Sequence, residues 1–322
     1  MADRTSFGKE TTTDDVLEGI DLTGKLVLVT GASGGIGAET ARALATAGAS
    51  VTLAARNVSK AEGVAVEIRT STGNPAVDVL ELVLDQPDRV REAAKVYLAG
   101  HDKLHLLINN AGVMACPLER TAAGWEMQFA TNHMGHFLFT CLLAPILRAA
   151  APARIVNLSS AGHRFSGIVF DDIHYERRPY DKWEAYGQSK TANVLFSVEL
   201  DRRLGADGVH VYAIHPGMIM TELARHMSQD DLKELGRRAA RGREAGVQVD
   251  PSRSRHERLC GHRARARGQG RPLPRGLPRR GSENGRLPDR RLGLRAGFRA
   301  GPPSVDRLRG GAGGELRPLA IA

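Results

Sequence analysis

The sequence predicts an α/β protein built on a doubly wound parallel sheet of the Rossmann type. Short apolar segments alternate with helix-like segments up to about Glu244, which is the pattern of successive βαβ units. A glycine-rich turn, TGASGGIG at 30–37, directly follows the first apolar segment. After Glu244 the alternation stops and a segment rich in Arg, Gly and Pro begins. We therefore expect a single folded domain followed by an irregular tail.

The expected strands are short runs rich in Val, Leu and Ile, which are typical of parallel strands buried on both faces. They lie at 25–33, 50–56, 76–85, 104–112, 153–161 and 209–217. Helical periodicity predicts helices at 35–49, 87–99, 125–149 and 185–204. Ligands of such open sheets bind at the carboxyl ends of the strands, so we expect the functional residues there.

Charge is unevenly distributed along the chain. The 322 residues include 45 Lys and Arg and 36 Asp and Glu, which gives a formal net charge of +9. From Arg241 to the end there are 20 Arg, no Lys and 7 acidic residues, which leaves 25 basic and 29 acidic residues before it. The excess positive charge therefore belongs to the tail, and the folded part is mildly acidic.

The cysteines and the apolar runs predict a cytoplasmic protein. Cys116, Cys141 and Cys260 are far apart and form no CxxC pair, which argues for a reducing compartment and against disulfides or a zinc site. The histidines likewise indicate no metal site. The first 25 residues are polar, and the apolar run at 137–147 is too short to span a bilayer. We therefore expect no membrane segment.

The glycine-rich turn predicts a dinucleotide site. Gly31, Gly35 and Gly37 fall between the first strand and the first helix, together with Ser33 and Ile36. Glycine there lets the backbone approach a pyrophosphate, and the helix N-terminus offers free N–H groups. Glycine is also common in ordinary tight turns, but the position at the start of a βαβ unit favours cofactor binding.

The end of the second strand, AARNVSK, favours NADP(H) over NAD(H). NAD-binding proteins usually place an acid here to bind the ribose 2′-hydroxyl, whereas an Arg accommodates a 2′-phosphate. Ala55 occupies the position expected for the acid, Arg56 follows it, and Lys60 lies in the next turn. The alternative interpretation is the solvated basic start of a helix.

The segment YGQSK places two reactive side chains on one helix face. Tyr186 and Lys190 are four residues apart in a predicted helix. A free phenol has a pKa of about 10, and a nearby ammonium lowers that pKa because it stabilises the phenolate. Such a tyrosine can exchange a proton with a carbonyl or alcohol oxygen. Taken alone, the motif is more typical of a pair on a helix surface, so the surrounding motifs must show whether it is a catalytic pair.

That context is an ordered set of motifs between Gly24 and Leu223. The set comprises TGxxxGxG at 30–37, Asp85 after the third strand, NNAG at 109–112, Asn132, NLSS at 157–160, YxxxK at 186–190, and HPG followed by Thr221. In this order the chain resembles the short-chain dehydrogenase/reductase family. The segments EMQFATNHMGHFLFT and WEAYGQSKTANVLFSVEL resemble the branch that holds retinol dehydrogenases and the catalytic domain of WW-domain oxidoreductases.

The resemblance implies an oxidoreductase that moves a hydride between NADP(H) and an alcohol, aldehyde or ketone. Tyr186 would be the acid and base, and Ser160 would bind the substrate oxygen. Lys190 would hold the nicotinamide ribose and lower the pKa of Tyr186, and Asn132 would support a water-mediated proton path. Besides Tyr186 and Lys190, the implied cofactor site contains Gly31, Ser33, Gly35, Ile36, Gly37, Arg56, Lys60, Asp85, Asn109, Ala111, Gly112, Pro216, Gly217, Ile219 and Thr221.

The resemblance also implies an organisation for the whole chain. We expect an N-terminal arm at 1–22, a dinucleotide-binding and catalytic domain at 23–242, and the basic tail at 243–322. The helices at 125–149 and 185–204 often form dimer contacts in relatives, which implies a homodimer or homotetramer. No membrane segment of the kind found in animal retinol dehydrogenases is expected, which argues against a membrane-bound retinoid role.

The separation of 26 residues between Ser160 and Tyr186 is longer than in many members of the family. The extra segment should border the substrate. Its apolar side chains are Phe165, Ile168, Phe170 and Trp183. They could contact the substrate or could pack within the loop.

Three interpretations of the tail compete. A nucleic-acid-binding arm usually mixes Lys with Arg and includes aromatic residues, whereas this tail has no Lys and a single aromatic residue, Phe298. A substrate domain would need an apolar periodicity that the tail lacks. We favour a frameshift, because GC-rich genes read out of frame encode Arg, Gly, Pro and Ala. A frameshift would remove the last core strand and the substrate-covering segment and leave the catalytic motifs in place.

The expected function is therefore that of an enzyme with a small-molecule substrate and without a nucleic-acid partner. The alternative is a catalytically weak or silent nucleotide-binding interaction protein on the same fold.

Overall fold

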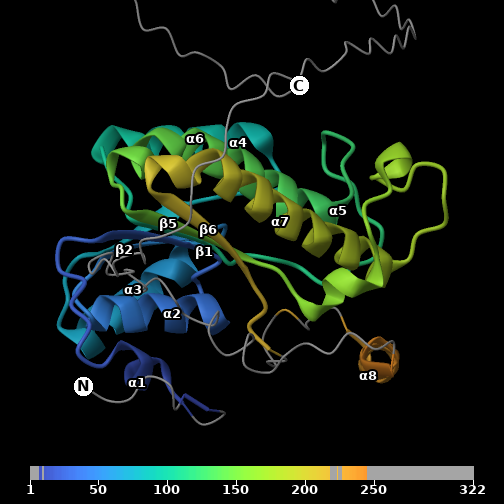
Figure 1. Cartoon of the computed structure of the whole chain (residues 1–322), viewed down its shortest axis with the longest axis horizontal. Helices are drawn as coiled ribbons and strands as arrows, with labels where there is room; N and C mark the ends of the chain where they lie inside the picture. Colours follow the sequence, from blue (N-terminus) through green and yellow to red (C-terminus); the bar gives the residue numbers. More distant parts are fainter. Residues whose placement is uncertain (1–6, 9–10, 218–222, 224–226, 245–322) are drawn as a thin grey trace, which may run out of the picture. The chain divides into compact units, whose positions relative to one another are not determined.

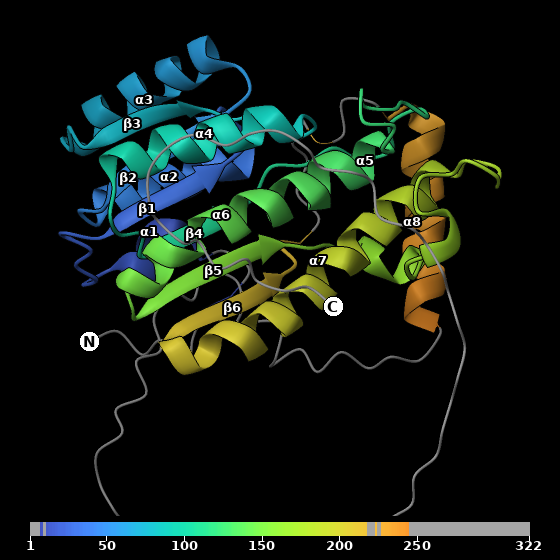
Figure 2. The same cartoon turned by 90° about the horizontal axis from the view of Figure 1, so that it is seen from above.

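A computed structural model describes residues 7–8, 11–217, 223 and 227–244. They form a six-stranded parallel sheet in the order β3-β2-β1-β4-β5-β6 (Figure 2). Helices cover both faces of this sheet, which confirms the predicted doubly wound fold. The predicted cofactor contacts Ile219 and Thr221, and the tail from residue 245 onward, lie outside the described residues.

All six predicted strands are present. They are β1 (Leu26–Thr30), β2 (Ser50–Ala55), β3 (Val77–Glu81), β4 (Leu106–Asn109), β5 (Ala153–Leu158) and β6 (Val209–Ile214). In the middle of the sheet, Val29 of β1 pairs with Leu53 of β2 on one side and Ile108 of β4 on the other. The strand order reverses between β1 and β4, and in open sheets of this kind such a reversal leaves a crevice at the carboxyl ends.

Helices pack on both faces of the sheet. The helices of the described part are α1 (Thr13–Leu17), α2 (Gly35–Thr46), α3 (Val58–Thr72), α4 (Pro87–Gly100), α5 (Met127–Phe129), α6 (Gly135–Ala149), α7 (Lys182–Leu204) and α8 (Gln229–Glu244). Shorter segments are the π-helical η2 (Ala130–Met134) and the 3-10 segments η3 (Ala161–Phe165), η4 (Phe170–Asp172) and η5 (Gly205–Asp207). Figure 1 shows α2 and α3 on one face of the sheet and α4, α6 and α7 on the other.

Two apolar layers hold the helices to the sheet. The layer under α4, α6 and α7 includes Phe139 and Leu143, and the layer under α2 and α3 includes Ile68. Successive strand side chains point to opposite faces, so β1 contributes Leu28 to the first layer and Val29 to the second. Both faces of the strands are buried, which explains why the strands are continuous apolar runs in the sequence.

The structure differs from the predicted elements in three places. The predicted helix at 125–149 is interrupted by η2, where the Gly135 N–H bonds to the Ala130 carbonyl five residues back. β3 ends at Glu81 and does not extend to 85. α1, α3 and α8 were not among the predicted helices. No helix in the described part of the chain is long and apolar enough to cross a membrane.

Candidate functional site

A cleft of about 1220 Å³ lies at the carboxyl ends of the central strands. Its volume exceeds that of a typical site for one small ligand, so it has room for a cofactor together with a substrate. Fifteen of the predicted site residues line it: Gly31, Ser33, Gly35, Ile36, Gly37, Arg56, Lys60, Asp85, Ala111, Gly112, Ser160, Tyr186, Lys190, Pro216 and Gly217. The fold therefore gathers residues that are spread over almost 190 positions of the sequence.

The β1–α2 turn has no room for larger side chains. Gly31 has a φ of +67°, and a Cβ at this position would lie 2.7 Å from the Ala111 Cα. A Cβ on Gly37 would lie 2.5 Å from the Gly31 carbonyl oxygen. The N-cap of α2, Gly34, provides no side-chain bond to the first N–H groups of the helix. Because a helix start with such N–H groups binds anions, this turn fits a pyrophosphate.

Two basic side chains line the cleft beyond the end of β2. Arg56 follows Ala55, the last residue of that strand, and Asn57 caps α3 by accepting a hydrogen bond from the Lys60 N–H over 2.9 Å. The Lys60 Nζ lies 3.6 Å from the position that a Cβ on Gly34 would occupy. The side chain of Lys60 therefore reaches back over the glycine turn. This part of the cleft fits the ribose end of a dinucleotide.

Tyr186 and Lys190 both face the cleft from α7. Tyr186 is 3% exposed, and its ring packs so closely on η3 that a Cβ on Gly162 would lie 2.7 Å from its Cε1. The Lys190 Nζ lies 5.6 Å from the centre of the Tyr186 ring and donates to the Leu158 carbonyl over 3.0 Å. Ser160 hydrogen-bonds the Tyr186 hydroxyl. The three predicted groups thus meet at one point of the cleft wall.

Burial opposes the predicted lowering of the pKa of Tyr186 by Lys190. Burial raises the pKa of Tyr186 to about 12, and the Ser160 hydrogen bond offsets part of this rise. Burial also lowers the pKa of Lys190 itself to about 8. A sequence shows the four-residue spacing of the pair but not the removal of both groups from water, which is the larger effect here.

Contrary to the prediction, Asn109 does not line the cleft. Its amide is buried under the sheet and donates to Thr140 over 2.9 Å and to Asn157 over 2.7 Å. The next residue, Asn110, lines the cleft and donates to the Thr30 carbonyl over 2.8 Å. Neighbouring side chains at the end of a strand point to opposite sides, which explains the exchange of roles.

Asn132 is fully buried in η2 and connects the loop after β4 to α7 through hydrogen bonds. Its Oδ1 accepts from the Val113 N–H over 2.8 Å, and its Nδ2 donates to the Val113 carbonyl and to the Ser189 hydroxyl. A Cβ on Gly112 would lie 3.1 Å from Asn132 Oδ1 and 3.6 Å from the Lys190 Nζ. Asn132 therefore fixes the loop after β4 beside α7 without lining the cleft itself.

The other side of the cleft is apolar. Phe165 lines it together with residues that no motif of the sequence indicates: Met114, Cys116, Met127, Leu223, Met227, Leu232 and Leu235. Ile168, Phe170 and Trp183 do not line the cleft. Phe170 is 74% exposed and Trp183 packs edge-on against Phe165. Of the four apolar residues predicted in the extra segment, Phe165 alone borders this space.

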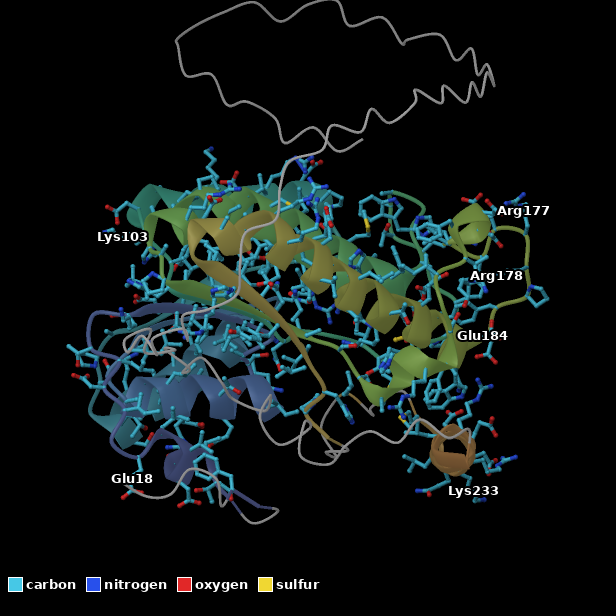
Figure 3. All side chains as sticks on the ribbon, in the orientation of Figure 1. Glu18, Lys103, Arg177, Arg178, Glu184 and Lys233 are labelled. Carbon is cyan, nitrogen blue, oxygen red and sulfur yellow. The ribbon has the colours of Figure 1, made fainter. Side chains whose placement is uncertain are left out.

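The extra segment is held against α7 by polar contacts. Gln188, a buried residue of YGQSK, accepts from the Val169 N–H over 3.0 Å and donates to the Ile173 carbonyl over 2.8 Å. Arg178 stacks on Tyr175 and forms an ion pair with Glu184 over 3.5 Å (Figure 3). The loop is therefore fixed to the helix that carries Tyr186.

A family model described as short chain dehydrogenase matches residues 25–232. The chain belongs to this family. The resemblance of the motifs predicted this family.

The chain is similar to several named relatives. Human retinol dehydrogenase 12 is 50% identical over 209 residues, which cover 65% of this chain and 66% of the relative. Human retinol dehydrogenase 11 is 51% identical over 209 residues, which cover 65% of each chain. The similarity thus spans just under two thirds of the length of these relatives. It confirms the predicted retinol-dehydrogenase-like branch.

Solved structures with the same fold include two complexes with NADP. The RhlG/NADP complex of Pseudomonas aeruginosa has a TM-score of 0.54 at 27% identity and covers 67% of this chain and 82% of its own. A metagenomic short-chain oxidoreductase in complex with NADP has a TM-score of 0.51 at 30% identity and covers 68% and 92%.

Proposed function

We propose that this protein transfers a hydride between NADP(H) and the carbon of an alcohol or carbonyl group, with Tyr186 as the acid and base. The observation that carries the proposal is that Tyr186, Lys190 and Ser160 line the same cleft as the glycine turn. A phenol in this position can exchange a proton with a substrate oxygen, while the turn fits the pyrophosphate of a dinucleotide.

The chain's own groups supply the proton chemistry. Because its pKa is raised to about 12, Tyr186 is a neutral phenol at pH 7 and can protonate the oxygen of a carbonyl substrate. The Ser160 hydroxyl favours the phenolate that remains, and Lys190, whose pKa is about 8, keeps a positive charge nearby at neutral pH. When bound, the nicotinamide supplies or accepts the hydride at C4.

The proposed preference for NADP(H) rests on the residues at the end of β2. Ala55 supplies no carboxylate for a ribose 2′-hydroxyl, and the cationic side chains of Arg56 and Lys60 line the cleft beside it. Such cations form strong charge-assisted hydrogen bonds with a phosphate. The NADP complexes of two structural relatives support the same preference.

The proposed substrate is an aldehyde or ketone, or the matching alcohol, with an apolar body. Support comes from the apolar side of the cleft, where Phe165, Leu232 and Leu235 lie. The names of the retinol dehydrogenases at about 50% identity also support it. We therefore include a retinoid aldehyde among the compounds to be tested.

An oxidation assay tests the proposal. Purified protein is supplied with NADPH or NADH and a panel of carbonyl compounds, from short aldehydes to all-trans-retinal. The consumption of NADPH or NADH is followed by the decrease in the absorbance of its reduced nicotinamide. We expect turnover with an apolar aldehyde and a preference for NADPH of about tenfold or more. NADPH binding without turnover of any compound would instead support the silent nucleotide-binding alternative.

Tyr186→Phe is the matched control, because it removes the hydroxyl and keeps the ring that packs on Gly162. We expect turnover to fall about 10²- to 10⁴-fold, with NADPH affinity unchanged within about twofold. Equal turnover of the variant and the wild type would exclude Tyr186 as the acid and base.

A further inference from the structure

His136 joins two parts of the site from inside α6. The side chain is 2% exposed and does not line the cleft. Its Nε2 lies 2.8 Å from the hydroxyl of Thr30, the last residue of β1, and its Nδ1 lies 3.1 Å from the carbonyl oxygen of Asn132. The imidazole thus bridges the strand that leads into the glycine turn and the π-helical segment η2.

The chemistry of the partners fixes every proton in this bridge. A carbonyl oxygen can only accept, so the Asn132 contact places the ring proton on Nδ1. The Nε2 atom is then an acceptor, and the Thr30 hydroxyl donates to it. The lone pairs of the same hydroxyl accept from the N–H groups of Asn110 and Ala111, over 2.9 and 3.0 Å. Burial lowers the pKa of His136 to about 3, which keeps the ring in the neutral form that this arrangement requires.

Both ends of the bridge continue into the site. Through Thr30, the imidazole supports Asn110 and Ala111, which line the cleft. Through Asn132, it supports the residue that pins the Val113 peptide and the Ser189 hydroxyl on α7. A π-helical turn often occurs at functional positions because it changes which groups its carbonyls meet. Here the Asn132 carbonyl accepts from His136 and also from the Asn193 amide.

We propose that His136 is a positioning residue with two separable effects, one on the cofactor loop through Thr30 and one on the catalytic helix through Asn132. This inference rests on the proposed oxidoreductase function. A side chain needed only for packing would be replaceable by an apolar residue of similar size, whereas the bridge needs an acceptor at one end and a donor at the other.

Three variants separate the two effects. His136→Gln keeps an acceptor at the position of Nε2 for Thr30. His136→Asn keeps a donor at the position of Nδ1 for the Asn132 carbonyl, and His136→Leu keeps neither. The readouts are the dissociation constant of NADPH by fluorescence titration, kcat at saturating NADPH, and the folded fraction by circular dichroism.

We expect His136→Leu to weaken NADPH binding and to lower kcat, each about tenfold, as for the loss of one buried hydrogen bond. His136→Gln should restore NADPH binding to within about twofold but leave kcat low, and His136→Asn should do the reverse. The control is His133→Asn, which replaces another buried histidine that packs on phenyl rings and keeps a donor at the position of Nδ1 for Asn193. It should change stability alone.

The outcomes are distinguishable. If the wild type binds no NADPH, the proposed function fails and this inference fails with it. The second outcome is a wild type that binds NADPH and reduces the carbonyl normally. If the Gln and Asn variants then lose NADPH affinity and kcat in the same proportion, the two separable effects proposed for His136 are wrong. If each variant lowers only the fraction of folded protein, and the folded molecules keep normal NADPH affinity and kcat, His136 is a packing residue.

Discussion

Lys190 is a buried ammonium whose partner is neutral. The residue is 4% exposed, and its Nζ donates to the Leu158 carbonyl. Burial lowers its pKa from 10.5 to about 8. Between these two pH values the unfolded chain keeps a proton that the folded chain has lost, so the free energy of unfolding rises with pH in this window. Below about pH 8 the folded protein bears the full penalty of the buried charge.

We therefore expect Lys190→Met to be inactive but more stable than the wild type at pH 7, by about 2 kcal/mol. The Leu158 carbonyl keeps the Asn193 amide as a donor over 3.1 Å, so the substitution leaves no unpaired acceptor. The gain should have largely disappeared by pH 10. Urea unfolding of both proteins at the two pH values measures this, with the exposed Lys233→Met as the control. A gain that is the same at both pH values would contradict the expectation.

Individual residues were predicted well where a motif fixes them and poorly where burial decides. The glycines of the turn, Tyr186 and Lys190 lie in the cleft as expected. Asn109 and Asn110 are identical side chains, and the strand geometry that separates them is not visible in NNAG. The role of His136 is not visible in the sequence, because its contact with Thr30 spans 106 positions and no local pattern indicates it.

The β1–α2 turn is the element whose shape depends most on small side chains. A Cβ on Gly37 would lie 2.5 Å from the Gly31 carbonyl and from the Asn110 amide nitrogen. We expect Gly37→Ala to destabilise the protein by about 1–3 kcal/mol and to remove measurable NADPH binding. In α3, Gly63 has no atom within 4 Å of a built Cβ. Gly63→Ala should stabilise by about 0.5–1 kcal/mol and leave NADPH binding unchanged. Thermal unfolding and NADPH titration of both variants check this; similar behaviour would mean that the turn tolerates a side chain.

Helix α8 forms part of the apolar side of the cleft. Leu232 and Leu235, three residues apart and hence on one face, line the cleft. Ion pairs from α8 to the start of α7 fix the helix there: Asp231 with Lys182 over 2.5 Å and Arg238 with Asp181 over 3.1 Å. Figure 2 shows α8 beside the beginning of α7, beyond the carboxyl ends of the strands. An element that lines the apolar part of the cleft is therefore present before residue 245.

We expect the double variant Leu232→Ser, Leu235→Ser to raise KM for an apolar aldehyde about tenfold to a hundredfold, because buried apolar contact is lost. KM for NADPH should not change, since the glycine turn is untouched. The control on the same helix is Lys233→Ala, whose side chain is 71% exposed (Figure 3). Steady-state kinetics with both substrates varied give the two constants. A parallel rise in both constants would show that α8 supports the whole cleft and not the substrate side alone.

At the level of elements, the strands were predictable because both of their faces are buried. The π-helical turn η2 spans only five residues, which is too short a window for apolar periodicity to separate it from the α-helix that follows. α8 was missed because it is strongly polar, with a short apolar face that matters only where it meets the cleft. Both of these elements contribute residues to the cleft lining, Thr131 from η2 and Leu232 from α8.

The whole chain divides its charge between a mildly acidic part before Arg241 and the arginine-rich remainder. The cleft-lining residues of the described part end at Arg238. Neither the proposed proton transfer nor the proposed cofactor site uses a residue beyond it. If the tail binds a polyanion, that binding should depend steeply on salt and should be separable from the redox activity.

A chain ended after Glu244 tests this division. We expect it to keep the NADPH dissociation constant and kcat of the full chain within about threefold, because the chemistry of a site depends on the residues that form it. Full-length and shortened protein are compared in the NADPH assay and in single-stranded RNA binding at about 50 and 200 mM salt. The tail bears the excess positive charge but lacks Lys and has one aromatic residue, so we expect RNA binding by the full chain to be weak and to vanish at the higher salt. RNA binding that persists at that salt and is lost on shortening would assign the tail a function of its own and would contradict the frameshift hypothesis.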